Sequence, residues 1–126
     1  MGLKLKRRQI ETNHAVAFLN RLRQYNPDLA EAIYHVPNES KTYTRTDIGI
    51  KAGQPDYCLP IPMGIFGALY IELKRPELAG TKNHGLSKAQ QTRLPMLAVW
   101  NRVVVCYSWQ EAIQAVHEYM GLSASI

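Results

Sequence analysis

The sequence predicts a small α/β fold, in which a mixed sheet of about four strands is covered by helices on both faces. Residues 7–25 and the segment after Ser108 carry apolar residues at helical spacing. Residues 69–74 alternate between apolar and polar, which is typical of a strand with one buried face. The apolar, β-branched run at 103–107 indicates a central strand covered on both faces. The expected order of elements is α-(α)-β-β-β-α-β-α.

Length and composition indicate one domain spanning residues 1–126. The formal net charge of +5 fits a polyanionic partner, although a modest excess of charge also maintains solubility. The N-terminal run Lys4, Lys6, Arg7 and Arg8 fits phosphate contact and a solvated arm equally well. The two cysteines lack zinc spacing, and the sequence shows no signal peptide or long apolar run. We therefore expect a cytoplasmic protein that binds neither a membrane nor an organic cofactor.

The first helix is expected from Arg7 to Tyr25. Glu11 lies beside its apolar stripe near the helix start, where an acid also complements the helix dipole. Asn26 and Pro27 then predict a capped short helix over residues 29–33, followed by a short strand at 33–36. The polar segment 41–53 is the longest loop, and we expect it to face the ligand.

A hairpin is expected next, formed by a strand that begins with Asp56 and by the stretch Gly67–Arg75, with a turn near residues 63–66. Antiparallel pairing would bring Asp56 beside Glu72 and Lys74. Strand geometry places Glu72 and Lys74 on one face, about 6.5 to 7 Å apart, which leaves space for a metal and a water molecule. A cross-strand ion pair is the alternative, and the Glu-x-Lys pattern alone favours it.

The segment after this hairpin predicts a helix from Lys88 towards Val99. Ser87 caps it, and Gln90 at the third position completes a capping box. Pro95 predicts a kink or a restart within this helix.

The last third of the chain contains the run 103–107 and a final helix. Asn101 suits the turn before the strand, because Asn tolerates left-handed conformations. Ser108 and Glu111 predict a second capping box, and Gly121 closes the helix that follows.

The polar positions of these elements form an ordered set that resembles a known family. The set consists of Glu11, Gly53-x-Pro55-Asp56, Glu72-Leu73-Lys74 and Leu86-Ser87-x-x-Gln90, and His35-x-Pro37-Asn38-Glu39 adds to it. It resembles the PD-(D/E)xK nuclease superfamily and, more narrowly, the virus-type replication-repair nuclease (VRR-NUC) family, which includes stand-alone phage-type proteins. The resemblance runs from about Glu11 to Ala115 and implies a restriction-endonuclease-like fold. Pro95 and Asn101 depart from the family pattern.

The resemblance implies a site that uses Mg²⁺ or Mn²⁺. The implied metal ligands are Glu11, Asp56, Glu72 and the main-chain carbonyl of Leu73. Lys74 would orient the attacking water and offset charge on the phosphate. Gln90 would position Lys74 or a water, although the capping box by itself also explains this residue. The basic residues expected to contact nucleic acid are Lys6, Arg7, Arg8, Lys41, Arg45 and Lys51.

The implied activity is that of a metal-dependent DNA endonuclease that acts as a homodimer on branched DNA such as four-way junctions, in replication, repair or phage packaging. A nuclease acting on flap or duplex DNA is one alternative. A non-catalytic nucleic-acid-binding module of the same fold is another, and an interaction domain without a nucleic acid partner is a third.

Overall fold

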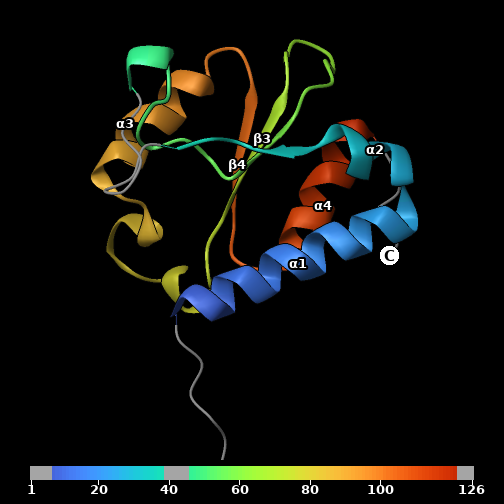
Figure 1. Ribbon diagram of the computed structural model, residues 1–126, viewed down its shortest axis with the longest axis horizontal. Helices are drawn as coiled ribbons and strands as arrows, with labels where there is room; N and C mark the ends of the chain where they lie inside the picture. Colours follow the sequence, from blue (N-terminus) through green and yellow to red (C-terminus); the bar gives the residue numbers. More distant parts are fainter. Residues whose placement is uncertain (1–6, 39–45, 122–126) are drawn as a thin grey trace, which may run out of the picture.

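The structure is a computed structural model that describes residues 7–38 and 46–121, apart from the side chains of Arg7 and Arg8. Its elements follow the order expected from the sequence (Figure 1). The α-helices are α1 (Arg7–Tyr25), α2 (Pro27–Ala32), α3 (Lys88–Leu97) and α4 (Trp109–Met120). The strands are β1 (Tyr34–His35), β2 (Tyr57–Leu59), β3 (Leu69–Leu73) and β4 (Arg102–Cys106). Three short 3-10 helices complete the set: η1 (Thr46–Ile48), η2 (Pro76–Leu78) and η3 (Lys82–Gly85).

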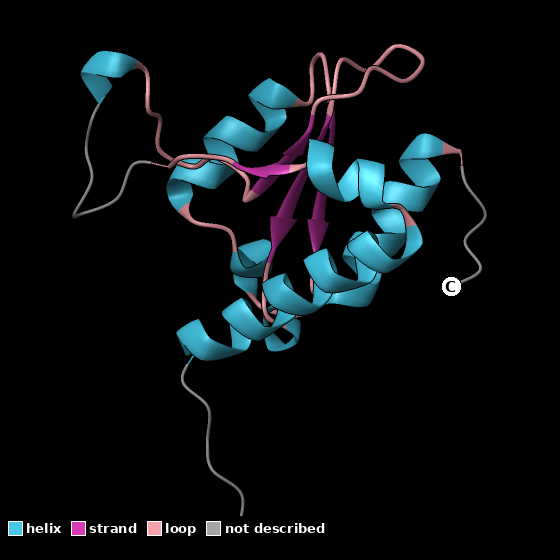
Figure 2. Ribbon diagram, turned by 45° about the vertical axis from the view of Figure 1, so that its right-hand side comes forward, coloured by secondary structure: helices cyan, strands magenta, loops and turns pink. Residues whose placement is uncertain are grey.

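The four strands form one mixed sheet in the order β1-β2-β3-β4. The first three strands pair antiparallel, whereas β3 and β4 run parallel and are joined through α3. Figure 2 shows the strands enclosed by helices. In Figure 1, α3 and α4 lie on opposite sides of β3 and β4, and α1 crosses below α4. The structure therefore confirms the predicted α/β class with a four-stranded mixed sheet and helices on both faces.

The main core lies between the sheet and the pair α1 and α4. Leu69, Ile71 and Leu73 point from β3 into it and meet Phe18 of α1 and Ile113 of α4. These are the alternate residues of the period-two pattern, so the strand presents the predicted apolar face. The other face of β3 carries Tyr70, which packs against a small cluster that includes Cys58 of β2, and Glu72, which contacts Gln90 of α3.

The run 103–107 does not form a central strand, and this prediction was wrong. Among the described strands, β4 lies at the edge of the sheet and pairs with β3 alone, and Val103, Val104 and Val105 are half-buried. Residues of α3 line a hollow with Val103 and Val105, whereas Val104 packs against the main core. An edge strand between two helices is apolar on both faces, so its pattern is the same as that of a central strand.

Helix α3 runs unbroken through Pro95 and ends at Leu97, without the predicted restart. Proline removes one helical hydrogen bond, the one to the Gln91 carbonyl, and Pro95 stands in the last turn, where little helix remains to be disturbed. Asn101 is also not left-handed, because Asn83 and His84 are the only non-glycine residues with positive φ in the described part of the chain. The Asn101 side-chain amide instead donates to the Leu97 carbonyl at 3.0 Å.

The second capping box is only half formed. The Ser108 hydroxyl accepts from the Glu111 N–H at 3.1 Å, as predicted. The Glu111 carboxylate, however, accepts from the N–H of Tyr107 at 3.1 Å instead of reaching Ser108. Gly121 closes α4 in the left-handed conformation, at φ 70°.

Candidate active site

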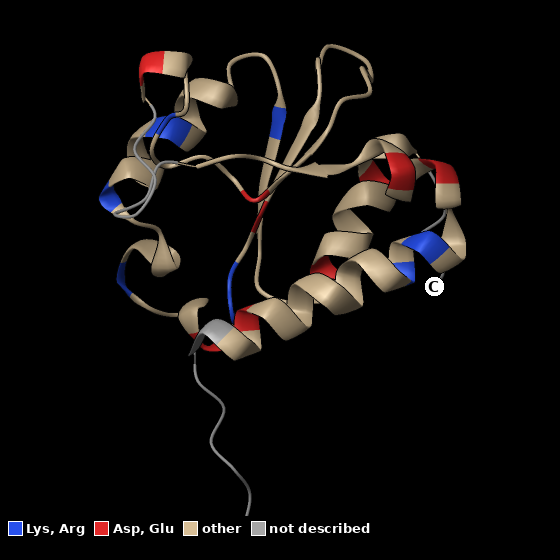
Figure 3. Ribbon diagram, viewed as in Figure 1, with Lys and Arg blue, Asp and Glu red and all other residues tan. Residues whose placement is uncertain are grey.

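The four implied metal ligands and Lys74 line one cavity of about 260 Å³, where β2 and β3 approach the first turns of α1, whereas Gln90 is not part of its lining. Its lining consists of Glu11, Thr12, Ala15, His35, Asp56, Tyr57, Glu72, Leu73 and Lys74. Acidic and basic segments come together at this place (Figure 3). A larger hollow of about 580 Å³ lies between the β2–β3 hairpin and α4, but it is lined by none of the expected site residues.

Asp56 is fixed by the strand next to it. It precedes β2, whose register pairs Tyr57 with Ile71, so that Asp56 falls beside Glu72. Its Oδ2 accepts a hydrogen bond from the backbone N–H of Leu73 at 2.8 Å. The segment before it lies directly against α3. A Cβ on Gly53 (φ +77°) would lie 2.4 Å from the Ala89 carbonyl oxygen, so this close approach requires a glycine. A glycine and a strand register therefore set the place of this carboxylate.

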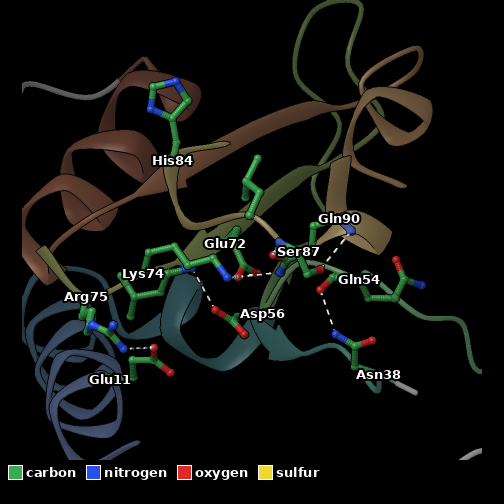
Figure 4. Close-up of polar contacts among 12 residues, drawn as sticks. Glu11, Asn38, Gln54, Asp56, Glu72, Lys74, Arg75, His84, Ser87 and Gln90 are labelled. Carbon is green, nitrogen blue, oxygen red and sulfur yellow. Dashed lines mark hydrogen bonds and ion pairs between the residues drawn. The ribbon is translucent and has the colours of Figure 1, made fainter. Parts of the chain in front are cut away.

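Glu72 is the buried centre of the site, with only 3% of its surface exposed. Its Oε2 accepts from the Gln90 amide at 2.7 Å and lies 3.0 Å from the Lys74 Nζ (Figure 4). Its Oε1 is buried and has no hydrogen-bond partner among the described residues. Glu72 and Lys74 therefore form an ion pair with each other along the end of β3, inside a cavity, and not the cross-strand pair that was the alternative interpretation.

Gln90 takes part in the helix cap and in the site at once. Its Oε1 accepts from the Ser87 N–H at 3.0 Å, and the Ser87 hydroxyl accepts from the Gln90 N–H at 3.2 Å, which is a complete capping box. Its Nε2 is left to donate to Glu72. One amide thus joins the start of α3 to the buried carboxylate on β3.

The two central carboxyl groups resist ionisation. Burial raises the pKa of Glu72 to about 7, and the negative charge of Asp56 adds to this effect, whereas Lys74 and Gln90 act in the opposite direction. Burial also raises the pKa of Asp56, partly offset by the Leu73 N–H and by the charges of His35 and Lys74. A cation placed between the two carboxyl groups would favour their charged forms.

The residues present fit a divalent cation of the magnesium type. Carboxylate oxygens of Asp56 and Glu72 are hard ligands, and the unpartnered Glu72 Oε1 is an acceptor that a cation would satisfy. No three His, Cys, Asp or Glu side chains within residues 9–38 and 46–121 are close enough together to hold a metal by themselves. Backbone carbonyl and water ligands, or a movement of Glu11 across the cavity, would have to complete the coordination.

Glu11 reaches the cavity from α1, but it does not contact the other two acids. Among the described residues it pairs with Arg75, with 3.9 Å between Glu11 Oε1 and Arg75 Nη1. From the sequence, Arg75 was not expected in the site. His35 counted towards the family resemblance without an assigned role, and in the structure it lines the cavity and packs edge-on against Tyr57. The position of Arg75 directly after Lys74 was the available signal for the first of these.

Most of the basic residues expected to contact nucleic acid fall outside the described structure. Lys6, Lys41 and Arg45 lie outside the described residues, and Arg7 and Arg8 open α1 without described side chains. Lys51 is exposed before Gly53. Their role in binding stays a prediction.

Two further polar residues have structural roles. The Nδ1 of His14 accepts from the Trp109 N–H at 3.1 Å, which ties α1 to the start of α4. The Asn38 amide donates to the Gln54 carbonyl at 3.0 Å and so supports the segment before Asp56. Glu39, the neighbour of Asn38 in the sequence, lies outside the described residues.

Comparison with known proteins finds a likeness among solved structures. No protein-family model matches the sequence, and no curated protein does. A solved structure described as a "VRR_NUC domain protein" superposes with a TM-score of 0.71 at 25% sequence identity, covering 90% of this chain and 89% of that chain. Separately, none of the helices within the described residues has the length and apolar character needed to cross a membrane.

Proposed function

Because this chain belongs to the VRR-NUC family, a family of nuclease-type domains, we propose that residues 1–126 form one domain that cleaves DNA as a metal-dependent endonuclease. The observation that supports this most is the meeting of Asp56, Glu72 and Lys74 in one cavity, with Gln90 bound to Glu72. Nucleases of this kind generally depend on a divalent metal. The family places the chain among nucleases, and the cavity supplies the groups that such chemistry needs.

Phosphodiester hydrolysis needs a nucleophilic water, neutralisation of the phosphate and stabilisation of the leaving oxygen. Bound Mg²⁺ or Mn²⁺ would supply a Lewis acid for the phosphate and would lower the pKa of the attacking water. Asp56 and Glu72 would hold the cation, together with the Leu73 carbonyl and Glu11. Lys74, 3.0 Å from Glu72, lies where its ammonium group can orient the water and balance charge on the phosphate. Gln90 would keep Glu72 in place.

We further propose that the substrate is branched DNA, such as a four-way junction, and that the chain acts as a homodimer. The +5 net charge favours a polyanionic substrate. A junction is resolved by cutting two strands, and two copies of the domain would supply two such cavities. Flap or duplex DNA is the alternative substrate.

The test is cleavage of labelled four-way junction, flap and linear duplex DNA with Mg²⁺, Mn²⁺ or EDTA. Wild type is compared with Asp56→Asn, Lys74→Ala and the control Asp28→Asn, which changes an exposed acid in the first turn of α2. We expect metal-dependent cutting that both site substitutions abolish and the control retains, with DNA binding preserved in all variants. Sedimentation of the same samples reports whether the chain is a dimer.

Each other outcome has a definite meaning. If wild type binds DNA but cuts none of the substrates with either metal, the chain is a nucleic-acid-binding module. If it neither binds nor cuts DNA, the proposed function is wrong. A preference for flap or linear duplex would keep the nuclease and replace the substrate.

A further inference from the structure

Arg75 lies between two carboxylates at the edge of the cavity. It follows β3, and its side chain reaches Glu11 on α1 from one end (Figure 4). From the other end it reaches Glu77 in η2. The Arg75 Nε is 2.6 Å from Glu77 Oε1, which is a short charge-assisted contact, whereas its Nη1 is 3.9 Å from Glu11 Oε1. The guanidinium is thus held firmly by Glu77 and directed towards Glu11.

The Arg75 Nη1 is shielded from solvent and has no hydrogen-bond acceptor among the described residues. The whole side chain is only 14% exposed. A DNA phosphate therefore has no direct access to this nitrogen, and the nearest carboxylate in its direction is that of Glu11. A buried guanidinium donor without an acceptor is costly, which favours movement of Glu11 towards it and not away into water.

The negative charges around the cavity explain why a cation beside Glu11 would matter. Glu11, Asp56 and Glu72 all line the cavity, and their like charges repel one another. Lys74 pairs with Glu72, and Arg75 is the cation that faces Glu11 within the described part of the chain. The Glu11 side chain is 40% exposed, and without Arg75 it would be free to turn outward into water.

We propose that Arg75 is a positioning residue that holds Glu11 at the cavity and thereby strengthens the binding of a divalent cation there. The inference rests on the proposed function, because that function supplies the divalent cation. Arg75 itself takes no part in the proposed hydrolysis. Arg75 acts through Glu11, so its effect depends on the presence of the Glu11 carboxylate. Substitution of an outer residue that orients a metal ligand typically weakens metal binding by about 10-fold to 100-fold.

The test is calorimetric titration of the full chain with Mn²⁺ in the absence of DNA. Wild type is compared with Arg75→Ala, Arg75→Lys, Glu11→Gln and the double variant of Arg75→Ala with Glu11→Gln. We expect Arg75→Ala to weaken Mn²⁺ binding by about tenfold and Arg75→Lys to restore part of the loss. In the Glu11→Gln background, Arg75→Ala should have no further effect.

Three results would overturn the inference: an equal loss in both backgrounds, unchanged affinity in a folded Arg75→Ala protein, or tighter binding of Mn²⁺ after the substitution. Should Arg75→Ala fail to fold, Glu77→Gln replaces it, because the Glu77 side chain is 56% exposed and its loss only loosens Arg75. That variant should show a smaller loss of affinity that again depends on Glu11. Wild type that binds no Mn²⁺ and cuts no DNA refutes the proposed function instead.

Discussion

Gln90 is the residue at which the stability of the fold and the chemistry of the site can be separated by experiment. Ser87→Ala removes one hydrogen bond of the capping box, that from the Gln90 N–H at 3.2 Å, and leaves the Gln90 side chain intact. Gln90→Ala removes the bond to the Ser87 N–H at 3.0 Å and also the bond to Glu72 at 2.7 Å. Both variants lose a hydrogen bond of the cap, and only Gln90→Ala also loses the hydrogen bond to Glu72 in the site.

The structure gives the expected magnitudes. Loss of the cap in Ser87→Ala costs about 1 kcal/mol. Gln90→Ala loses a comparable capping bond and a bond to a buried carboxylate worth about 1.5 to 3 kcal/mol, so its total is about 3 kcal/mol. For a chain of this size, 1 kcal/mol lowers Tm by roughly 4 °C, which predicts a shift of roughly 4 °C for the first variant and 12 °C for the second.

Two assays check this prediction. Urea denaturation in EDTA measures the free energy of unfolding without metal, and cleavage of labelled DNA across an Mg²⁺ titration measures the site. Below the melting temperature of both variants, Gln90→Ala should reduce cleavage by about 10-fold to 100-fold, whereas Ser87→Ala should leave it near the wild-type rate. Equal loss of cleavage in the two variants would refute the reasoning, because Gln90 would then act only through the start of α3.

Further predictions concern the backbone before the first acid, a histidine and the metal. Gly53→Ala should destabilise the protein by about 2 kcal/mol more than Gly49→Ala in urea denaturation. A Cβ at Gly53 would lie 2.4 Å from a backbone oxygen of α3, whereas no atom of the described residues lies within 4 Å of a Cβ at Gly49. Equal losses would contradict this. His14→Ala should cost about 1 kcal/mol through the lost bond to the Trp109 N–H and leave Mn²⁺ affinity unchanged, and weaker binding would make His14 a metal ligand. Millimolar Mg²⁺ should raise the Tm of wild type but not of Asp56→Asn, and an equal rise in both would place the binding elsewhere.

The order of elements could be predicted from the sequence because each signal was local. α1 begins at Arg7 and ends at Tyr25 as its periodicity indicates, and Asn26 caps α2 by accepting from the Leu29 N–H. The pairing of the β2–β3 hairpin follows from the positions of its turn and its apolar face. The sequence alone therefore predicts that Asp56 lies beside Glu72, and the register of β2 and β3 confirms it.

The rest depends on information that no short stretch carries. Whether β4 lies at the centre or the edge of the sheet depends on which elements cover it, and a run of valines is compatible with both positions. The contact between Glu11 and Arg75 joins the first helix to the end of the third strand, and neither residue has a local pattern that indicates its partner. The burial of Glu72 likewise depends on its contact with α3, which comes later in the chain.

From the sequence, capping the helix and acting in the site are alternative explanations of Gln90, but the structure shows that the two do not exclude each other. A carboxamide has an acceptor end and a donor end, and the capping box uses only the acceptor. The donor end then points from the first turn of α3 towards β3, where Glu72 accepts it. A glutamate at this position would cap the helix equally well but would bring a second negative charge to Glu72. The helix cap therefore explains why a residue with a side-chain oxygen stands at position 90. The contact with Glu72 explains why a glutamine suits this position better than a glutamate.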